Sequence, residues 1–274
     1  MMPVENIKKR SRLSLDRVKN EPVITEMTGS DKRNYDFGED IGLLVFRPWY
    51  NCISYPKHFA YAKSYDFPVR IAFVDEPVDP QGFIDGRVEW RGWNLPNWIH
   101  AAKQLQEDGV KAIVGGCGLT GAIQSLIAAE LDIPFYSSTV LFAPLLHKSM
   151  AKGKRIGILT VSEEQLRVRD NVLLKECGVT DDMPIVVRGM NEAEPEDTNV
   201  WLTMTTDAYD KNAVEQAIVN TAVNLKNEYP DLGMFLLECT EMPVYSEAIR
   251  QATGLPVFDA LDMVNMVQRT VCKN

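Results

Sequence analysis

The sequence predicts an α/β protein whose parallel sheets are covered by helices and divided between two lobes. Three observations lead to this prediction. Short continuous apolar runs alternate with longer helical patterns, the alternation occurs twice along the chain, and the chain is 274 residues long with 45% hydrophobic residues, enough for two cores. No apolar run approaches the roughly 20 residues of a transmembrane helix.

The predicted organisation follows changes in polarity. Residues 1–38 are polar and charged, so we expect an N-terminal arm there, with one helix near 12–19. We expect the first lobe over 39–150 and the second over 151–254, with residues 255–274 packing back onto the first lobe.

In the first lobe, residues 41–46 form a continuous apolar run, as expected for a strand covered on both faces. A helix over 98–108 ends at Gly109, which serves as its C-cap. A buried strand over 112–114 leads directly into a glycine-rich turn around Cys117. The other elements expected in this lobe are strands over 69–74 and 133–136 and a helix over 120–131.

The second lobe repeats this arrangement. A strand over 233–237 leads directly into Glu238-Cys239-Thr240-Glu241. Helices over 163–177 and 246–253 are each closed by a glycine, Gly178 and Gly254. The other elements expected in this lobe are strands over 155–159, 184–187 and 256–258 and helices over 210–228 and 262–270.

Two cysteines, Cys117 and Cys239, directly follow buried strands, and α/β folds bind ligands beyond the carboxyl ends of their strands. Small residues around Cys117 let backbone amides approach a ligand, and the following helix N-terminus favours a thiolate and an anionic group. Thr240 can donate a hydrogen bond to a carboxylate, and Glu241 can orient a neighbour. The alternative for each cysteine is a buried structural residue.

The remaining cysteines and the histidines are not spaced like the ligands of a metal site. There is no CxxC pair, and the sequence shows no P-loop, dinucleotide fingerprint or pyridoxal lysine motif, so we expect no metal and no cofactor. We expect the remaining cysteines and the histidines, which lack a recognisable partner in the sequence, to be structural: Cys52, Cys177, Cys272, His58, His100 and His147.

The net charge of −9 would repel a phosphate backbone, so we expect no nucleic-acid partner. The charged N-terminus lacks the apolar stretch of a signal peptide, and we expect a cytoplasmic protein without a membrane partner.

Two thiols at strand ends fit the removal of a proton beside a carboxylate. A base must take the proton while hydrogen-bond donors stabilise the developing enolate, and racemisation also needs an acid on the opposite face. Without a cofactor as electron sink, a preorganised anion site has to supply that stabilisation. A thiol pair, one on each lobe, can supply both the acid and the base.

The residues around both thiols resemble the two cysteine motifs of the aspartate/glutamate/hydantoin racemase superfamily. The motifs are Gly115-Gly116-Cys117-Gly118 and Leu236-Leu237-Glu238-Cys239-Thr240-Glu241-Met242-Pro243, extended by Tyr245-Ser246-Glu247-Ala248 and by residues 252–260. The resemblance runs from about residue 41 to the end. It implies two pseudo-symmetric α/β lobes, an active site in the cleft between them, no cofactor, and catalysis by Cys117 and Cys239.

The first motif departs from typical amino-acid racemases of this superfamily, which carry Cys-Asn-Thr where this chain has Cys117-Gly118-Leu119. The Cys-Gly form, residues 41–50 and the Ser64-Tyr65-Asp66 element are more similar to the branch containing algal-type dimethylsulfoniopropionate lyases. The resemblance therefore implies β-elimination from a small carboxylate, dimethylsulfoniopropionate, giving acrylate and dimethyl sulfide, with Cys239 as the base. The alternatives are an amino-acid racemase or epimerase using both thiols, and a binding protein that keeps the fold without the chemistry.

Half of the 24 aromatic residues, 12, lie between residues 49 and 98, and aromatic faces can hold an onium group by cation–π attraction. The alternative is an aromatic core or a subunit interface. Related folds often form dimers or tetramers, so we expect a homo-oligomer. The residues expected to bind the substrate are Arg47, Trp49, Tyr50, Tyr65, Gly118, Ser138, Thr160, Thr240 and Glu241.

Overall fold

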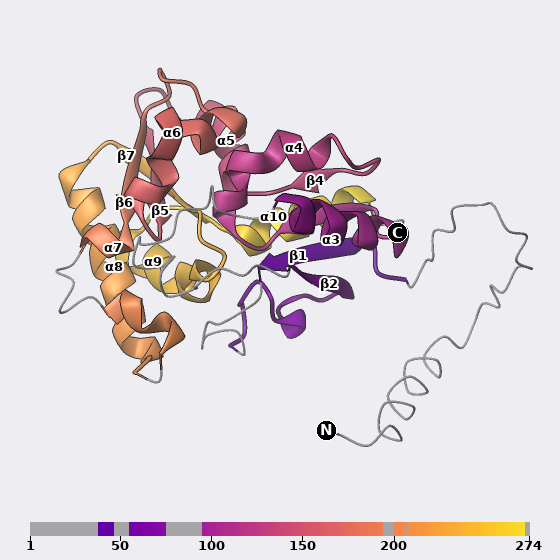
Figure 1. Ribbon diagram of the computed structural model, residues 1–274. Helices are drawn as coiled ribbons and strands as arrows, with labels where there is room; N and C mark the ends of the chain where they lie inside the picture. The colour runs from indigo at the N-terminus through magenta and orange to yellow at the C-terminus, as the bar shows by residue number, and fades with distance from the viewer. Residues whose placement is uncertain (1–37, 47–54, 75–94, 194–199, 207, 272–274) are drawn as a thin grey trace, which may run out of the picture. The chain divides into compact units, whose positions relative to one another are not determined.

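The computed structural model describes residues 38–46, 55–74, 95–193, 200–206 and 208–271 (Figure 1). Its strands form two sheets of four, and every pairing is parallel. The predicted fold class, α/β with parallel sheets flanked by helices, is confirmed. Within these ranges, every helix is too short or too polar to cross a lipid bilayer.

The first sheet has the order β2-β1-β3-β4. Its strands are β1 (Ile41–Phe46), β2 (Val69–Val74), β3 (Ala112–Gly115) and β4 (Phe135–Tyr136). Leu44 packs into one core, and its neighbours Leu43 and Val45 pack into another, because successive side chains of a strand point to opposite faces. The continuous apolar run therefore marks a strand buried on both faces, as predicted.

Helices cover both faces of this sheet. The helix α3 (Leu95–Glu107) buries Trp98, Ala102 and Leu105, which recur at helical spacing. On the opposite face, α10 (Ala260–Val271) contributes Met263, Val264 and Val267 to the core that contains Ile41. The last helix of the chain thus completes the core of the first sheet.

The second sheet repeats the order of the first, as β6-β5-β7-β8. Its strands are β5 (Arg155–Thr160), β6 (Ile185–Gly189), β7 (Leu232–Leu237) and β8 (Val257–Phe258). Because β3 and β7 occupy the same place in the two sheets, the residues that follow them occupy corresponding positions. The lobe boundaries at 150 and 254 stay a prediction.

The helices of the second lobe begin and end at residues whose side chains or conformation require it. The helix α6 (Glu163–Glu176) is capped by Ser162, whose Oγ accepts from the amide of Gln165, and α8 (Lys211–Glu228) is capped by Asp210. Gly254 ends α9 (Ser246–Thr253) in the left-handed conformation. The other helices among the described residues are η2 (Ala62–Ser64), α5 (Ala143–Ser149), α7 (Met190–Ala193), η5 (Thr139–Phe142), η6 (Val200–Thr205) and η7 (Met242–Tyr245).

One predicted helix differs from the structure. In place of a single helix over 120–131, a 3₁₀ segment η4 (Gly118–Ile123) precedes a short α4 (Gln124–Ala128). All six residues of η4 are buried. A Cβ at Gly121 would lie 2.9 Å from Sγ of Cys177, so this segment packs too closely against α6 for an ordinary amphipathic helix.

Candidate active site

Cys117 lies just beyond the carboxyl end of β3 and is the N-cap residue of η4. The amide and the hydroxyl of Thr120 both donate to the carbonyl oxygen of Cys117, over 3.0 and 2.6 Å, and fix the turn. The side chain keeps partial exposure. Burial and then the charge of Glu238 raise the pKa of the Cys117 thiol, while the amides of Leu119 and Thr120 act in the opposite direction.

Cys239 lies at the corresponding place after β7 and is 7% exposed. Burial is the main cause that raises the pKa of its thiol well above the ordinary value, followed by the charges of Glu241 and Glu238. The charge of Cys117 adds a smaller contribution in the same direction. The two thiols therefore lie in one electrostatic environment, and both are neutral at neutral pH.

Buried hydrogen bonds join the carboxyl ends of the two sheets. Thr240 donates to the carbonyl oxygen of Gly116 over 2.8 Å, and Thr139 donates to that of Leu237 over 2.8 Å. Gly116 and Thr139 belong to the first lobe, and Thr240 and Leu237 belong to the second, so each bond crosses between the lobes. The first bond fixes the turn that carries Cys117 against the turn that carries Cys239, and the second joins the start of η5 to the end of β7.

Glu238 is a buried carboxyl group between the two turns, with 1% of its surface exposed. Its Oε2 accepts a hydrogen bond of 2.7 Å from the hydroxyl of Thr160, whereas Oε1 has no hydrogen-bond partner among the described residues. A Cβ at Gly118 would lie 2.6 Å from Cδ of Glu238, so the two residues are in direct contact. Burial raises the pKa of Glu238 to about 7, and the bond from Thr160 opposes that shift.

A buried pair of His58 and Glu241 lies beside Cys239. The Nε2 atom of His58 bonds Oε2 of Glu241, and the amide of Ala60 donates to Nδ1 over 3.0 Å. Because Nδ1 accepts, the proton of the neutral imidazole is on Nε2 and points at the carboxylate. The expectation that His58 lacks a partner is therefore wrong. The partner is 183 positions away in the sequence, so no local pattern could have indicated it.

The sequence of residues 101–265 matches the family described as Asp/Glu/Hydantoin racemase. This chain belongs to the Asp/Glu/hydantoin racemase family. The predicted resemblance is confirmed. Since the match covers β3, β7 and both turns, the candidate site lies inside the matched region.

Comparison with curated proteins shows to which branch of the family this chain is similar. The chain is 31% identical over 231 residues to dimethylsulfoniopropionate lyase 7 of Emiliania huxleyi (strain CCMP1516), covering 77% of this chain and 66% of the relative. It is 30% identical over 157 residues to the dimethylsulfoniopropionate lyase of Durusdinium sp. clade D, covering 57% of this chain and 51% of that protein. The chain thus spans between half and two thirds of the length of these relatives.

Solved structures with the same fold include an aspartate racemase homologue and a glutamate racemase. An aspartate racemase homologue from Pyrococcus horikoshii OT3 superposes with a TM-score of 0.54 at 18% identity, covering 84% of this chain and 98% of that chain. Glutamate racemase RacE1 from Bacillus anthracis superposes with a TM-score of 0.52 at 15% identity, covering 86% and 85%. At this identity the likeness concerns the fold alone.

Several residues that we expected to bind the substrate direct their hydroxyl groups into hydrogen bonds within the protein. Thr160 donates to Glu238, and Thr240 donates to Gly116. Tyr65 is buried in the core of the first sheet and donates to the carbonyl oxygen of Phe59 over 2.7 Å. The hydroxyl of Ser138 caps η5 by accepting from the amide of Val140.

The structure therefore brings six of the predicted site residues together at the carboxyl ends of β3, β5 and β7: Cys117, Gly118, Thr160, Cys239, Thr240 and Glu241. The roles of these residues toward a substrate stay predictions. Arg47, Trp49 and Tyr50 lie outside the described residues. Sequence reasoning missed Glu238 and His58 as parts of this site.

The aromatic residues between 49 and 98 are described only in part. Trp98 is fully buried in the core beneath α3, as the alternative interpretation of an aromatic core expects. The ring of Tyr55 lies 6.2 Å from that of Tyr209, and Nζ of Lys211 lies 6.0 Å from the centre of the Tyr55 ring. Trp90 and Trp93 fall outside the described ranges.

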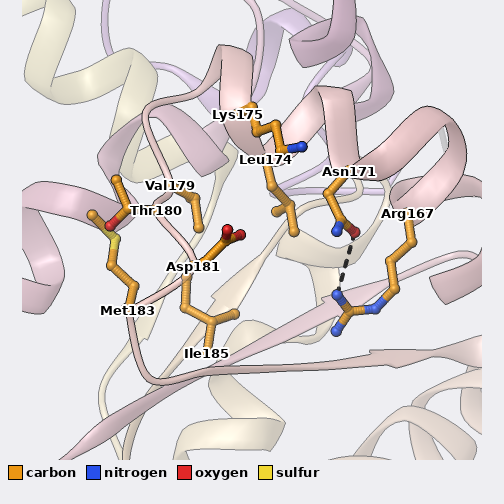
Figure 2. A pocket seen from close by; sticks show the side chains of 9 residues that line it. All are labelled: Arg167, Asn171, Leu174, Lys175, Val179, Thr180, Asp181, Met183 and Ile185. Carbon is orange, nitrogen blue, oxygen red and sulfur yellow. Dashed lines mark hydrogen bonds between the residues drawn. The ribbon is translucent and has the colours of Figure 1, made fainter.

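A separate pocket of about 140 Å³ lies on the second lobe, between α6 and the segment that leads into β6 (Figure 2). Arg167 extends across its edge and bonds Asn171 over 3.4 Å. None of the nine lining residues belongs to the candidate site. Nor does any group of three or more metal-ligating side chains occur in the ranges that the structure describes.

Proposed function

We propose that this chain is a cofactor-independent lyase that removes the proton beside the carboxylate of dimethylsulfoniopropionate. The observation that carries the proposal is the placement of two thiols at corresponding strand ends, fixed to one another by buried hydrogen bonds between the lobes. The lyase relatives support the choice of substrate, and family membership supports the thiol chemistry.

The proposed step balances without an added reagent. The thiolate of Cys239 takes a proton from the carbon beside the carboxylate, and the electron pair of that C–H bond forms the double bond of acrylate. The bond from the β carbon to sulfur breaks, and its electron pair stays on sulfur, so dimethyl sulfide leaves as a neutral molecule. Cys239 then releases its proton to solvent, while Cys117 orients the substrate.

The charges around the thiols favour a substrate that carries a cation. Burial raises the pKa of both thiols, and the carboxyl groups of Glu238 and Glu241 add to that effect when they are ionised. A sulfonium bound nearby lowers the pKa of a thiol, because an opposite charge favours the thiolate. Substrate binding therefore generates the base that the resting enzyme lacks at neutral pH.

A second candidate function is racemisation or epimerisation of an amino acid or a related acid. The equivalent positions of Cys117 and Cys239 in the two sheets favour it, because racemisation needs an acid and a base on opposite faces. The two thiols then exchange roles with the enantiomer. We also propose a cytoplasmic homo-oligomer without a metal, cofactor, nucleic acid or membrane as partner.

Headspace gas analysis of the purified protein with dimethylsulfoniopropionate tests the proposal. We expect release of dimethyl sulfide by the wild type, its loss in Cys117→Ala and Cys239→Ala, and its retention in Cys177→Ala, a buried cysteine that directly follows α6. Absence of release from folded wild type would reject the substrate. Incorporation of deuterium from solvent into recovered amino or hydroxy acids would then favour the racemase.

A further inference from the structure

The proposed mechanism does not use the carboxyl group of Glu238, although it lies within the site. This carboxyl group is buried, its Oε2 is bonded by Thr160, and its Oε1 has no partner among the described residues. A buried polar atom without a partner destabilises the folded state, so it calls for a physical reason. A hydrogen bond to a bound ligand supplies one.

The reaction needs a hydrogen-bond donor where the enolate develops, on the oxygens of the substrate's carboxylate. The sequence predicts that Thr160 and Thr240 bind the substrate. Their hydroxyls, however, already donate to Glu238 and Gly116. Glu238 touches Gly118 beside one thiol and precedes the other thiol in the chain. Its Oε1 is therefore an uncommitted oxygen between the two reactive groups.

We propose that Glu238 is a third catalytic residue, a neutral carboxylic acid whose Oε1–H donates a hydrogen bond to the carboxylate of the substrate. This role rests on the proposed function, since it serves the enolate formed by proton removal. Protonated Glu238 also removes one of the two negative charges that raise the pKa of the thiols. Protonation of Glu238 therefore stabilises the enolate of the substrate and also favours the thiolate form of the cysteines.

The surroundings determine the direction of the pH dependence. The groups that face Glu238 are Cys117 after β3, Cys177 after α6, Cys239 and Glu241 after β7, and the hydroxyl of Thr160 on β5. The three thiols have raised pKa values and stay neutral near pH 7. With its own pKa raised to about 7, Glu238 loses the donating proton as the pH rises through neutrality.

Binding of propanoate tests this role without requiring turnover, because propanoate is the carboxylate fragment shared by every candidate substrate. We expect its affinity for the wild type, measured by calorimetry, to be about 30-fold weaker at pH 8.5 than at pH 6, since only the protonated fraction binds. Glu238→Gln keeps a donor that does not titrate, so the pH dependence disappears. Thr160→Val removes the bond that lowers the pKa of Glu238, so the loss of affinity moves to higher pH.

Ser137→Ala is the matched control, because Oγ of Ser137 is another buried oxygen that has no hydrogen-bond partner within the described ranges. We expect this variant to keep the wild-type pH dependence. Affinity that is independent of pH in the wild type, an unchanged profile in Glu238→Gln, or no saturable binding at either pH would overturn the role of Glu238. Release of dimethyl sulfide is measured in parallel, so its absence rejects the substrate separately from the role of Glu238.

Discussion

Replacement of Gly118 by alanine tests whether the contact between the two turns positions the thiols. The added Cβ would lie 2.6 Å from Cδ of Glu238 and would also meet the carbonyl oxygen of that residue. Carbon atoms in contact are about 3.5–4.0 Å apart, so the turns must separate by roughly 1 Å. The backbone of Glu238 cannot easily yield, because its amide donates to Leu159 in the second sheet over 2.9 Å.

Two effects follow from that separation. Overpacking of this kind costs about 1–3 kcal/mol, which lowers the melting temperature by roughly 2–12 °C for a domain of this size. A displacement of about 1 Å between catalytic groups lowers turnover by about 100-fold. Replacement of glycine by alanine restricts the unfolded chain and so acts in the opposite direction, which makes a measured loss of stability a lower bound on the clash.

The assay combines thermal unfolding with release of dimethyl sulfide for wild type, Gly118→Ala and Gly233→Ala. The control makes the same chemical change in β7, where the new Cβ would lie 3.0 Å from Cβ of Lys154 and from Sδ of Met150, away from both thiols. We expect Gly233→Ala to lose some stability through these contacts but to keep the turnover of the wild type, because the change does not move the turns that carry the thiols. A Gly118→Ala variant with the stability and turnover of the wild type would refute the positioning argument.

Three further predictions concern the thiols and the bonds around them. Because the pKa of Cys117 is raised, we expect iodoacetamide to alkylate it slowly at pH 7 and about tenfold faster per pH unit above that; rapid labelling at neutral pH, seen by mass spectrometry, would contradict this. We expect His58→Ala to cost about 1–3 kcal/mol in urea unfolding, because the carboxyl group of Glu241 loses a buried hydrogen bond, and His58→Gln to cost less; equal stabilities would argue against the pair. We expect Thr240→Val to lose about 1–3 kcal/mol through its bond to Gly116, whereas Thr270→Val, near the end of α10, should lose less.

The parts of the fold that the sequence predicts are those determined by local patterns. The strand over 41–46 and the helix over 246–253 are found at the predicted residues, because an apolar run and a C-terminal glycine are local signals. The segment after Cys117 differs, because Gly118 and Gly121 are required by contacts with Glu238 and Cys177. Those contacts cross large distances in the sequence, so no local pattern contains them.

The same distinction applies to the site. Both cysteines follow strands, which the sequence reveals, and the structure places them at corresponding strand ends. Glu238 was missed because a glutamate in an isolated sequence is expected to face water. Its burial depends on the other lobe, and so does the pairing of His58 with Glu241. The sequence shows which residues can titrate, but whether each of them is buried or paired depends on the assembled fold.

The return of α10 to the first sheet affects how the chain can fold during synthesis on the ribosome. The strands of that sheet end at Tyr136, but the helix that covers one of its faces begins at Ala260. At typical rates of translation, roughly 6 to 25 s separate the two. Throughout that interval an apolar face that includes Ile41 and Leu43 lacks its final cover, so this face stays open to solvent and to transient contacts until α10 has been made.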